Sequence, residues 1–128
     1  MAIKAIHHIA IICTDYEVSK RFYTEVLGFS VLKETYRAAR DSFKLDLGLG
    51  ENYVIELFSF PDTPPRLSRP EASGLRHLAF AVDNIESEID ALAKKGIQIE
   101  DVRIDEITGK KFTFFTDPDN LPLEFYEI

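Results

Sequence analysis

The chain repeats one order of predicted secondary structure, and this repeat constrains its fold more than any other feature. Residues 6–60 predict a strand, a helix and three further strands, and residues 75–128 predict the same order again. A stretch with four prolines and no apolar periodicity, 61–74, separates the copies. We therefore predict an α+β fold of two tandem βαβββ modules: module one at about 1–60, a linker loop at 61–74 and module two at about 75–128. At 128 residues the two modules together have the size of a single domain.

The predicted elements have ordinary start and stop signals. In copy one the helix follows Thr14 or Asp15 as N-cap and stops at Gly28; in copy two it follows Asp83 and stops at Gly96. The first strands are 6–13 and 75–82, and the later strands are 30–37, 42–49, 52–60, 97–104, 110–117 and 121–128. The segment 117–120, Asp-Pro-Asp-Asn, predicts a turn.

Each copy carries a histidine in its first strand and a glutamate in its last strand. His77 follows His8 at the same interval, to within one residue, at which Glu124 follows Glu56. One histidine or glutamate in a strand is commonly an ordinary core or surface residue. Matching positions in both copies predict a shared site instead, because an apolar strand accepts a carboxylate only when something positive meets it. His7 is expected on the opposite face as a structural or surface residue.

Two imidazoles and two carboxylates form a mixed nitrogen and oxygen ligand set for a divalent metal. Zn, Ni, Co, Fe and Mn all suit such a set, so we expect one divalent ion per site without knowing which. Four protein ligands on an octahedral ion leave two positions for water or substrate, which is typical of a catalytic site.

Four stretches, HHIAIICTDYEVSKRFYTEVLGF, YVIELFSF, GLRHLAFAV and FTFFTDPDNLPLEFYE, closely resemble the glyoxalase I type of the vicinal oxygen chelate superfamily, in particular its small bacterial glyoxalase-like proteins. The resemblance covers essentially the whole chain. It implies a single glyoxalase-like domain whose curved sheets enclose a metal-binding cavity. It places the four metal ligands on His8, Glu56, His77 and Glu124. It also implies a homodimer, with the site completed within one chain or across two.

The resemblance further implies a metal-dependent lyase or isomerase acting on a small oxygenated substrate through an enediolate-type intermediate. Glu124 is then the leading general base, with Glu56 as its catalytic partner. Glutathione-using relatives carry an Arg and an Asn where this chain has Ile12 and Phe60. Use of glutathione is therefore not expected, and whether another thiol is a cosubstrate stays open.

Several residues are candidates for substrate binding. Phe58 and Phe60 share the predicted strand face of Glu56, while Phe112 and Phe114 precede the predicted turn. The alternative interpretation is that these phenylalanines are part of the hydrophobic core. Arg69 represents a group of arginines, any of which could bind a substrate carboxylate or phosphate or be an ordinary surface residue. This group is Arg37, Arg40, Arg66, Arg69 and Arg76.

The charge balance and the apolar pattern restrict the partners. Fifteen basic and 22 acidic residues give a net charge of −7, which argues against nucleic acid and anionic membranes. No apolar run approaches the roughly 20 residues of a membrane span. The single cysteine, Cys13, excludes a disulfide within the chain, is expected to be buried and favours a cytoplasmic location.

Two alternatives to glyoxalase-type chemistry remain open. One is another metalloenzyme: an epimerase, a ring-cleaving dioxygenase or an antibiotic thiol transferase. The other is a protein that binds a small molecule without catalysis.

Overall fold

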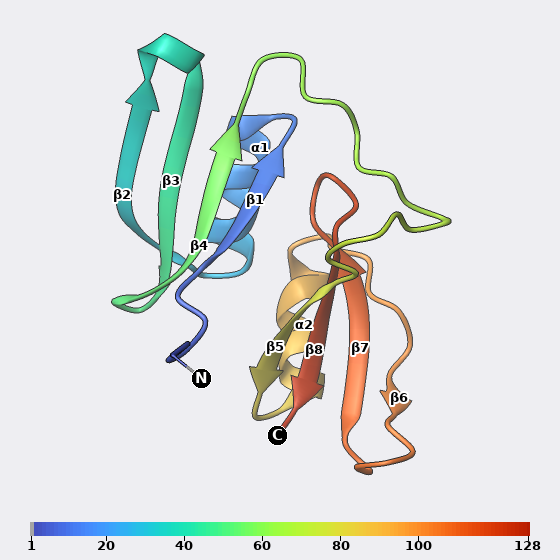
Figure 1. Cartoon of the computed structure of the whole chain (residues 1–128). Helices are drawn as coiled ribbons and strands as arrows, with labels where there is room; N and C mark the ends of the chain where they lie inside the picture. Colours follow the sequence, from blue (N-terminus) through green and yellow to red (C-terminus); the bar gives the residue numbers. More distant parts are fainter. Residues whose placement is uncertain (1) are drawn as a thin grey trace. The chain divides into compact units, whose positions relative to one another are not determined.

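The computed structural model describes residues 2–128 and divides the chain into two compact units, 1–65 and 66–128. Each unit contains one four-stranded mixed sheet with a helix on one face (Figure 1). The predicted α+β class and the βαβββ order are confirmed in both copies. That the two modules make up a single domain stays a prediction.

In unit 1 the sheet order is β1-β4-β3-β2, with β1 parallel to β4 and the other neighbours antiparallel. Its elements are β1 (Ile9–Cys13), α1 (Tyr16–Arg21), a π-helical turn (Phe22–Val26), β2 (Ser30–Arg37), a 3₁₀ turn (Ala38–Arg40), β3 (Ser42–Leu49) and β4 (Asn52–Ser59). α1 begins where predicted, because Asp15 Oδ1 accepts a hydrogen bond from the backbone N–H of Val18 at 3.2 Å.

Unit 2 repeats this topology with the order β5-β8-β7-β6 and a parallel β5–β8 pair. Its elements are β5 (Leu78–Val82), α2 (Ile85–Lys94), β6 (Arg103–Ile104), β7 (Lys111–Thr116) and β8 (Pro122–Glu127). The predicted cap of α2 at Asp83 is wrong: Asn84 Oδ1 accepts the N–H of Ser87 at 2.9 Å.

The predicted strand 97–104 is reduced to the two residues of β6. Before β6, the backbone N–H of Glu100 bonds to the carbonyl of Phe114 at 2.9 Å, while the Glu100 carbonyl accepts the Thr113 hydroxyl at 2.7 Å. A side chain thus replaces the backbone donor that a regular ladder needs, and the segment runs beside β7 without forming a strand.

Alternation gives each sheet one buried and one open face. In β1, Ile11 and Cys13 are buried, whereas Ala10 and Ile12 are exposed. The buried faces hold the cores of the two units, Leu45, Leu47, Ile55 and Leu57 in the first and Ile85, Leu92, Phe115, Leu123 and Phe125 in the second. α1 packs against β4 and α2 against β8, so the polar residues of β4 and β8 lie on the side away from the helices. No helix among residues 2–128 is both long and apolar enough to cross a membrane.

Candidate functional site

His8 and Glu56 come together in unit 1. His8 immediately precedes β1, Glu56 lies in the middle of β4, and the parallel register places Ala10 beside Glu56. His8 Nε2 is 3.3 Å from Glu56 Oε2, and the Glu56 side chain is only 14% exposed. The methyl group of Ala10 leaves the imidazole room to reach over the sheet to the carboxylate.

Unit 2 repeats this pair. His77 immediately precedes β5, Glu124 lies in β8, and Ala79 is the register partner of Glu124. His77 Nε2 is 3.6 Å from Glu124 Oε1, and the Glu124 side chain is 12% exposed. The repeat seen in the sequence is therefore also a repeat of geometry: each module positions one imidazole beside one carboxylate.

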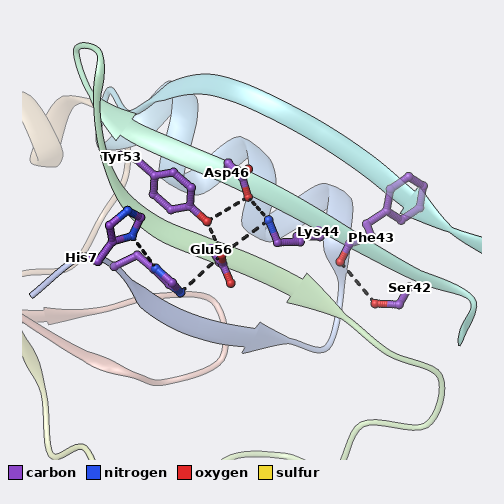
Figure 2. A network of polar contacts seen from close by, with 8 residues as sticks. His7, Ser42, Phe43, Lys44, Asp46, Tyr53 and Glu56 are labelled. Atoms are coloured by element: carbon purple, nitrogen blue, oxygen red, sulfur yellow. Dashed lines mark hydrogen bonds and ion pairs between the residues drawn. The ribbon is translucent and has the colours of Figure 1, made fainter.

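Glu56 belongs to a polar network that the sequence did not reveal (Figure 2). Asp46 of β3 is its antiparallel register partner, so two carboxylates lie side by side on neighbouring strands. Lys44 Nζ is 2.6 Å from Asp46 Oδ1 and 3.5 Å from Glu56 Oε2. The Tyr53 hydroxyl donates to Glu56 Oε2 and is 3.1 Å from Asp46 Oδ1. One ammonium group and one phenol thus offset the repulsion between facing like charges.

A β-bulge turns Tyr53 toward Glu56. The β3–β4 register runs from Leu47 opposite Ile55 directly to Gly48 opposite Tyr53, which leaves one extra residue in β4. A Cβ on Gly48 would lie 2.8 Å from the Gly50 carbonyl oxygen and 3.0 Å from that of Asn52. Glycine is therefore required where the chain turns tightly from β3 into β4.

The network keeps its two donors protonated. Burial and the hydrogen bond to Glu56 raise the pKa of the Tyr53 hydroxyl above its usual range. The hydrogen bond to Asp46 raises the pKa of Lys44. Both groups therefore stay protonated, and remain hydrogen-bond donors, further into alkaline pH than an isolated tyrosine or lysine.

His7 lies beside His8 instead of across the sheet from it. Their Nδ1 atoms are 2.9 Å apart, and both rings contact the Tyr53 ring, with centroids 5.4 and 5.3 Å away. The expected separation by alternation does not apply, because β1 begins only at Ile9. The contact at Nδ1 leaves Nε2 of His8 directed at Glu56.

The positions around Glu124 are aromatic where those around Glu56 are charged. Phe114 is the register partner of Glu124, as Asp46 is of Glu56. The Phe114 ring meets the His77 ring edge to face at 5.1 Å, and Phe112 packs beside it at 6.0 Å. The Arg103 guanidinium lies over both phenylalanine rings, 5.1 Å from Phe112 and 5.3 Å from Phe114.

Phe58 and Phe60 form a similar cluster in unit 1. Their rings stack 5.8 Å apart, and the Arg37 guanidinium lies 5.0 and 5.6 Å from them. Phe58 and Phe60 are half-buried, and Ile12, opposite Phe58 in the sheet, is 52% exposed. Ile12 is therefore not core filling within unit 1.

Two cavities of unit 2 border its histidine and its glutamate. A cavity of about 260 Å³ is lined by Glu71, Arg76, His77, Glu100, Arg103, Phe114 and Pro122. A second, of about 390 Å³, is lined by Ile104, Asp105, Glu106, Ile107, Phe112, Glu124 and Tyr126. Arg69 lines neither cavity, and its backbone N–H bonds to Glu71 Oε1 at 2.9 Å.

Each histidine–glutamate pair suits two neighbouring ligands of a metal ion. Ligand atoms at right angles around an ion, each about 2.1 Å from it, lie about 3 Å apart. The separations of 3.3 and 3.6 Å are close to that value. Within residues 2–128 the structure gathers no group of three or more His, Cys, Asp or Glu side chains able to hold a metal, so each pair alone is half of the predicted ligand set.

Three polar residues near the first pair were missed from the sequence: Lys44, Asp46 and Tyr53. Lys44 and Asp46 alternate with leucines in Lys-Leu-Asp-Leu, which is typical of a strand with one solvent face. No matching residues occur in copy two, so the repeat did not point to them. Arg103 was missed because it lies in a segment predicted as an ordinary strand.

A family model, that of the Glyoxalase/Bleomycin resistance protein/Dioxygenase superfamily, matches residues 5–125. Over 127 residues the chain is 62% identical to the uncharacterized protein YwkD of Bacillus subtilis, with 99% of both chains covered. It is 58% identical to the uncharacterized protein YaeR of Escherichia coli, over 99% of this chain and 98% of that one. The crystal structure of a glyoxalase family protein from Enterococcus faecalis is 51% identical, has a TM-score of 0.91, and is matched over 99% of this chain and 100% of that one.

Two more distant matches have names that indicate chemistry. A 2-epi-5-epi-valiolone epimerase from an Actinomyces species is 27% identical, over 97% of this chain and 79% of the epimerase. A fosfomycin resistance protein, FosX of Listeria monocytogenes, has a structure with Mn(II) and is 15% identical, with a TM-score of 0.72 over 97% of this chain and 92% of that one. At that identity the second likeness shows a shared fold alone.

Proposed function

The chain belongs to the Glyoxalase/Bleomycin resistance protein/Dioxygenase superfamily, and from this premise we propose that it is a divalent-metal-dependent lyase or isomerase of the glyoxalase type. The observation that carries the proposal is the repeated pair, His8 with Glu56 and His77 with Glu124. The four side chains would hold one divalent ion per site. When bound, the ion would supply Lewis-acid stabilisation of negative charge on substrate oxygens.

The two glutamates have different surroundings, which suggests different roles. Glu56 accepts a hydrogen bond from the Tyr53 hydroxyl and lies 3.5 Å from Lys44 Nζ, and these two donors fix the position of its carboxylate. Among the described residues only His77 comes within ion-pair distance of the Glu124 carboxylate, which also lines a cavity. Glu124 is therefore the better general base, positioned to take a proton from a carbon beside a substrate carbonyl, while Glu56 stays anchored.

The substrate is a small oxygenated molecule. Phe112 and Phe114 on the Glu124 side, and Phe58 and Phe60 on the Glu56 side, would exclude water from the reacting atoms. Ile12 leaves the first sheet without the arginine that glutathione-using relatives have there. Glutathione is thus not the expected thiol. A homodimer remains part of the proposal, because the resemblance implies one.

Epimerase chemistry is the second candidate, favoured by the 27% identity to the valiolone epimerase. Both reactions begin with removal of a proton beside a carbonyl group. The two reactions differ in the carbon, or the face of the carbon, to which the proton returns. The structure of the product therefore distinguishes them.

The test of this function is proton exchange measured in D₂O by NMR, after reconstitution with each candidate ion. Small α-oxoaldehydes, alone and with several thiols, are followed for deuterium at the carbon beside the carbonyl. Glu124→Gln is expected to retain the metal and to lose exchange by about 10²–10⁴-fold, the usual contribution of a general base. Glu56→Gln is expected to lose metal as well. Unchanged exchange in Glu124→Gln would exclude Glu124 as the base.

A further inference from the structure

The cavity beside His77 places two arginines next to a proposed metal ligand. Arg76 directly precedes His77 in the chain, and Arg103 belongs to β6; both line the cavity of about 260 Å³. Drug-sized ligands occupy about 300–1,000 Å³, so this cavity suits one end of a small molecule. In a chain with a net charge of −7, a cavity lined by two arginines is a candidate binding site for an anion.

Arg103 is pre-oriented for anion binding. Its guanidinium lies over the rings of Phe112 and Phe114, 5.1 and 5.3 Å from their centroids. These cation–π contacts restrict the position of the guanidinium, and the exposed Glu100 is its only ion-pair partner among residues 2–128, so its N–H groups can bind a carboxylate or phosphate. Phe114 also contacts the ring of His77 at 5.1 Å, so it links the arginine to the histidine.

The two glutamates of the cavity do not cancel this positive charge. Glu71 is held by Arg66 at 2.9 Å and by the backbone N–H of Arg69. Glu100 lies 3.6 Å from Arg103, and both side chains are more than half exposed. Exposed pairs of this kind contribute little, so a ligand anion can displace Glu100. Among residues 2–128 no side chain forms an ion pair with Arg76, whose guanidinium is available to a ligand.

We propose that this cavity is an anion subsite, in which Arg76 and Arg103 bind a carboxylate or phosphate group of the substrate. The inference rests on the proposed function and narrows it: the substrate is a small hydroxy or oxo compound that carries an acidic group. The acidic group lies at the arginines, and its oxygenated carbon lies toward His77. Arg103 and Arg76 therefore replace Arg69 as the arginines expected to recognise substrate.

The test is binding to the metal-free protein, so that it does not depend on catalysis or on the metal. The full chain is treated with chelator and titrated with inorganic phosphate, with pyruvate and with hydroxyacetone, an uncharged analogue of pyruvate, while backbone amide shifts are followed by NMR. Saturable shifts at residues 76, 77 and 103 are expected with phosphate, pyruvate or both. Pyruvate alone would indicate a carboxylate substrate, and phosphate alone a phosphate ester.

Three variants decide which side chains are responsible. Arg103→Gln and Arg76→Gln should each raise the dissociation constant about tenfold or more, since each removes a charge-assisted contact. Lys94→Gln, in the last turn of α2, removes the same charge from the same unit without touching the cavity and should bind as the unchanged chain does. Arg103 and Arg76 are exposed, so these substitutions are not expected to disturb folding, and the amide spectrum checks this.

The proposal is overturned if hydroxyacetone binds at these amides as tightly as pyruvate, or if both arginine variants bind both anions normally. An equal loss of anion affinity in Lys94→Gln would also overturn the proposal, because anion binding would then depend only on the net charge of the chain. Metal content, measured on parallel preparations purified without chelator, separates the two proposals. Metal without anion binding rejects only the subsite, and anion binding without metal rejects only the metalloenzyme.

Discussion

Asp46 and Glu56 lie directly opposite each other on β3 and β4, and their carboxylates share one ammonium group and one phenol. Facing like charges destabilise a sheet unless cations or donors lie between them. Lys44 and Tyr53 supply that compensation, and in doing so they fix the position of a proposed metal ligand. The positions of unit 2 equivalent to Lys44 and Asp46 hold Phe112 and Phe114, so the two halves of the repeat have become chemically different.

Removal of the shared cation should destabilise the fold. Lys44→Met keeps the length of the side chain but removes the ammonium group that the facing carboxylates of Asp46 and Glu56 share. We expect the free energy of unfolding to fall by about 1–3 kcal/mol, as for an uncompensated buried polar group. Urea denaturation measures the change. Lys110→Met, at an exposed position just before β7, is the control and should change the free energy of unfolding by no more than about 0.5 kcal/mol. Equal stability of Lys44→Met and the unchanged chain would show that the network needs no cation.

The bulge that presents Tyr53 depends on Gly48. In Gly48→Ala the new methyl group would lie 2.8 Å from the carbonyl oxygen of Gly50, so the backbone must shift. We expect a loss of about 1–3 kcal/mol, the usual cost of overpacking. Leu49→Ala, at a side chain 56% exposed in the same turn, should change stability by no more than about 0.5 kcal/mol. Thermal unfolding of both variants makes the comparison, and a neutral Gly48→Ala would mean that the turn adjusts freely.

The sequence predicted the repeat well because regular elements dominate it. The strands 30–37 and 42–49 have the predicted bounds, since apolar alternation and flanking turns define both ends. The contact between Tyr53 and Glu56 could not be predicted from the sequence. A one-residue bulge reverses the alternation of side chains along β4, and no residue type is diagnostic of such a bulge. The predicted strand 97–104 is longer than the strand in the structure. The ladder is interrupted by the side-chain hydrogen bond of Thr113, which comes from a segment distant in the sequence.

The N-cap of α2 is Asn84, one residue later than the Asp83 that the sequence predicts. Asn84→Ala removes the acceptor of the Ser87 N–H and should cost about 1 kcal/mol of stability. Asp83→Ala, one residue earlier, should cost much less. Chemical denaturation of the two variants side by side checks this, and the reverse order of stability would restore Asp83 as the cap.

Stability at acid pH should depend on Glu34 of β2. Hydrogen bonds from Lys20 and Tyr16 lower the pKa of its carboxyl. A lowered pKa stabilises the folded state above the ordinary glutamate value, and this stabilisation is lost as the pH falls through the lowered one. Glu34→Gln should therefore be less stable than the unchanged chain at pH 7 and equally stable in strong acid. The effect should be modest, below about 1 kcal/mol, because the side chain is 36% exposed.

Thermal unfolding across pH 2–8, with Glu51→Gln in the turn between β3 and β4 as the control, measures this dependence. A stability gap between Glu34→Gln and the unchanged chain that persists in strong acid would contradict the assigned cause.

Metal content tests the central claim most directly, and an exposed carboxylate of the same unit provides its control. The full chain is purified without chelator and analysed for elements beside His77→Ala and Glu88→Ala, the latter on the exposed side of α2. The account predicts about one divalent ion per chain in the unchanged protein and in Glu88→Ala, and a sharp loss in His77→Ala. No bound metal in the unchanged protein, even after incubation with Zn, Ni, Co, Fe and Mn, would contradict it.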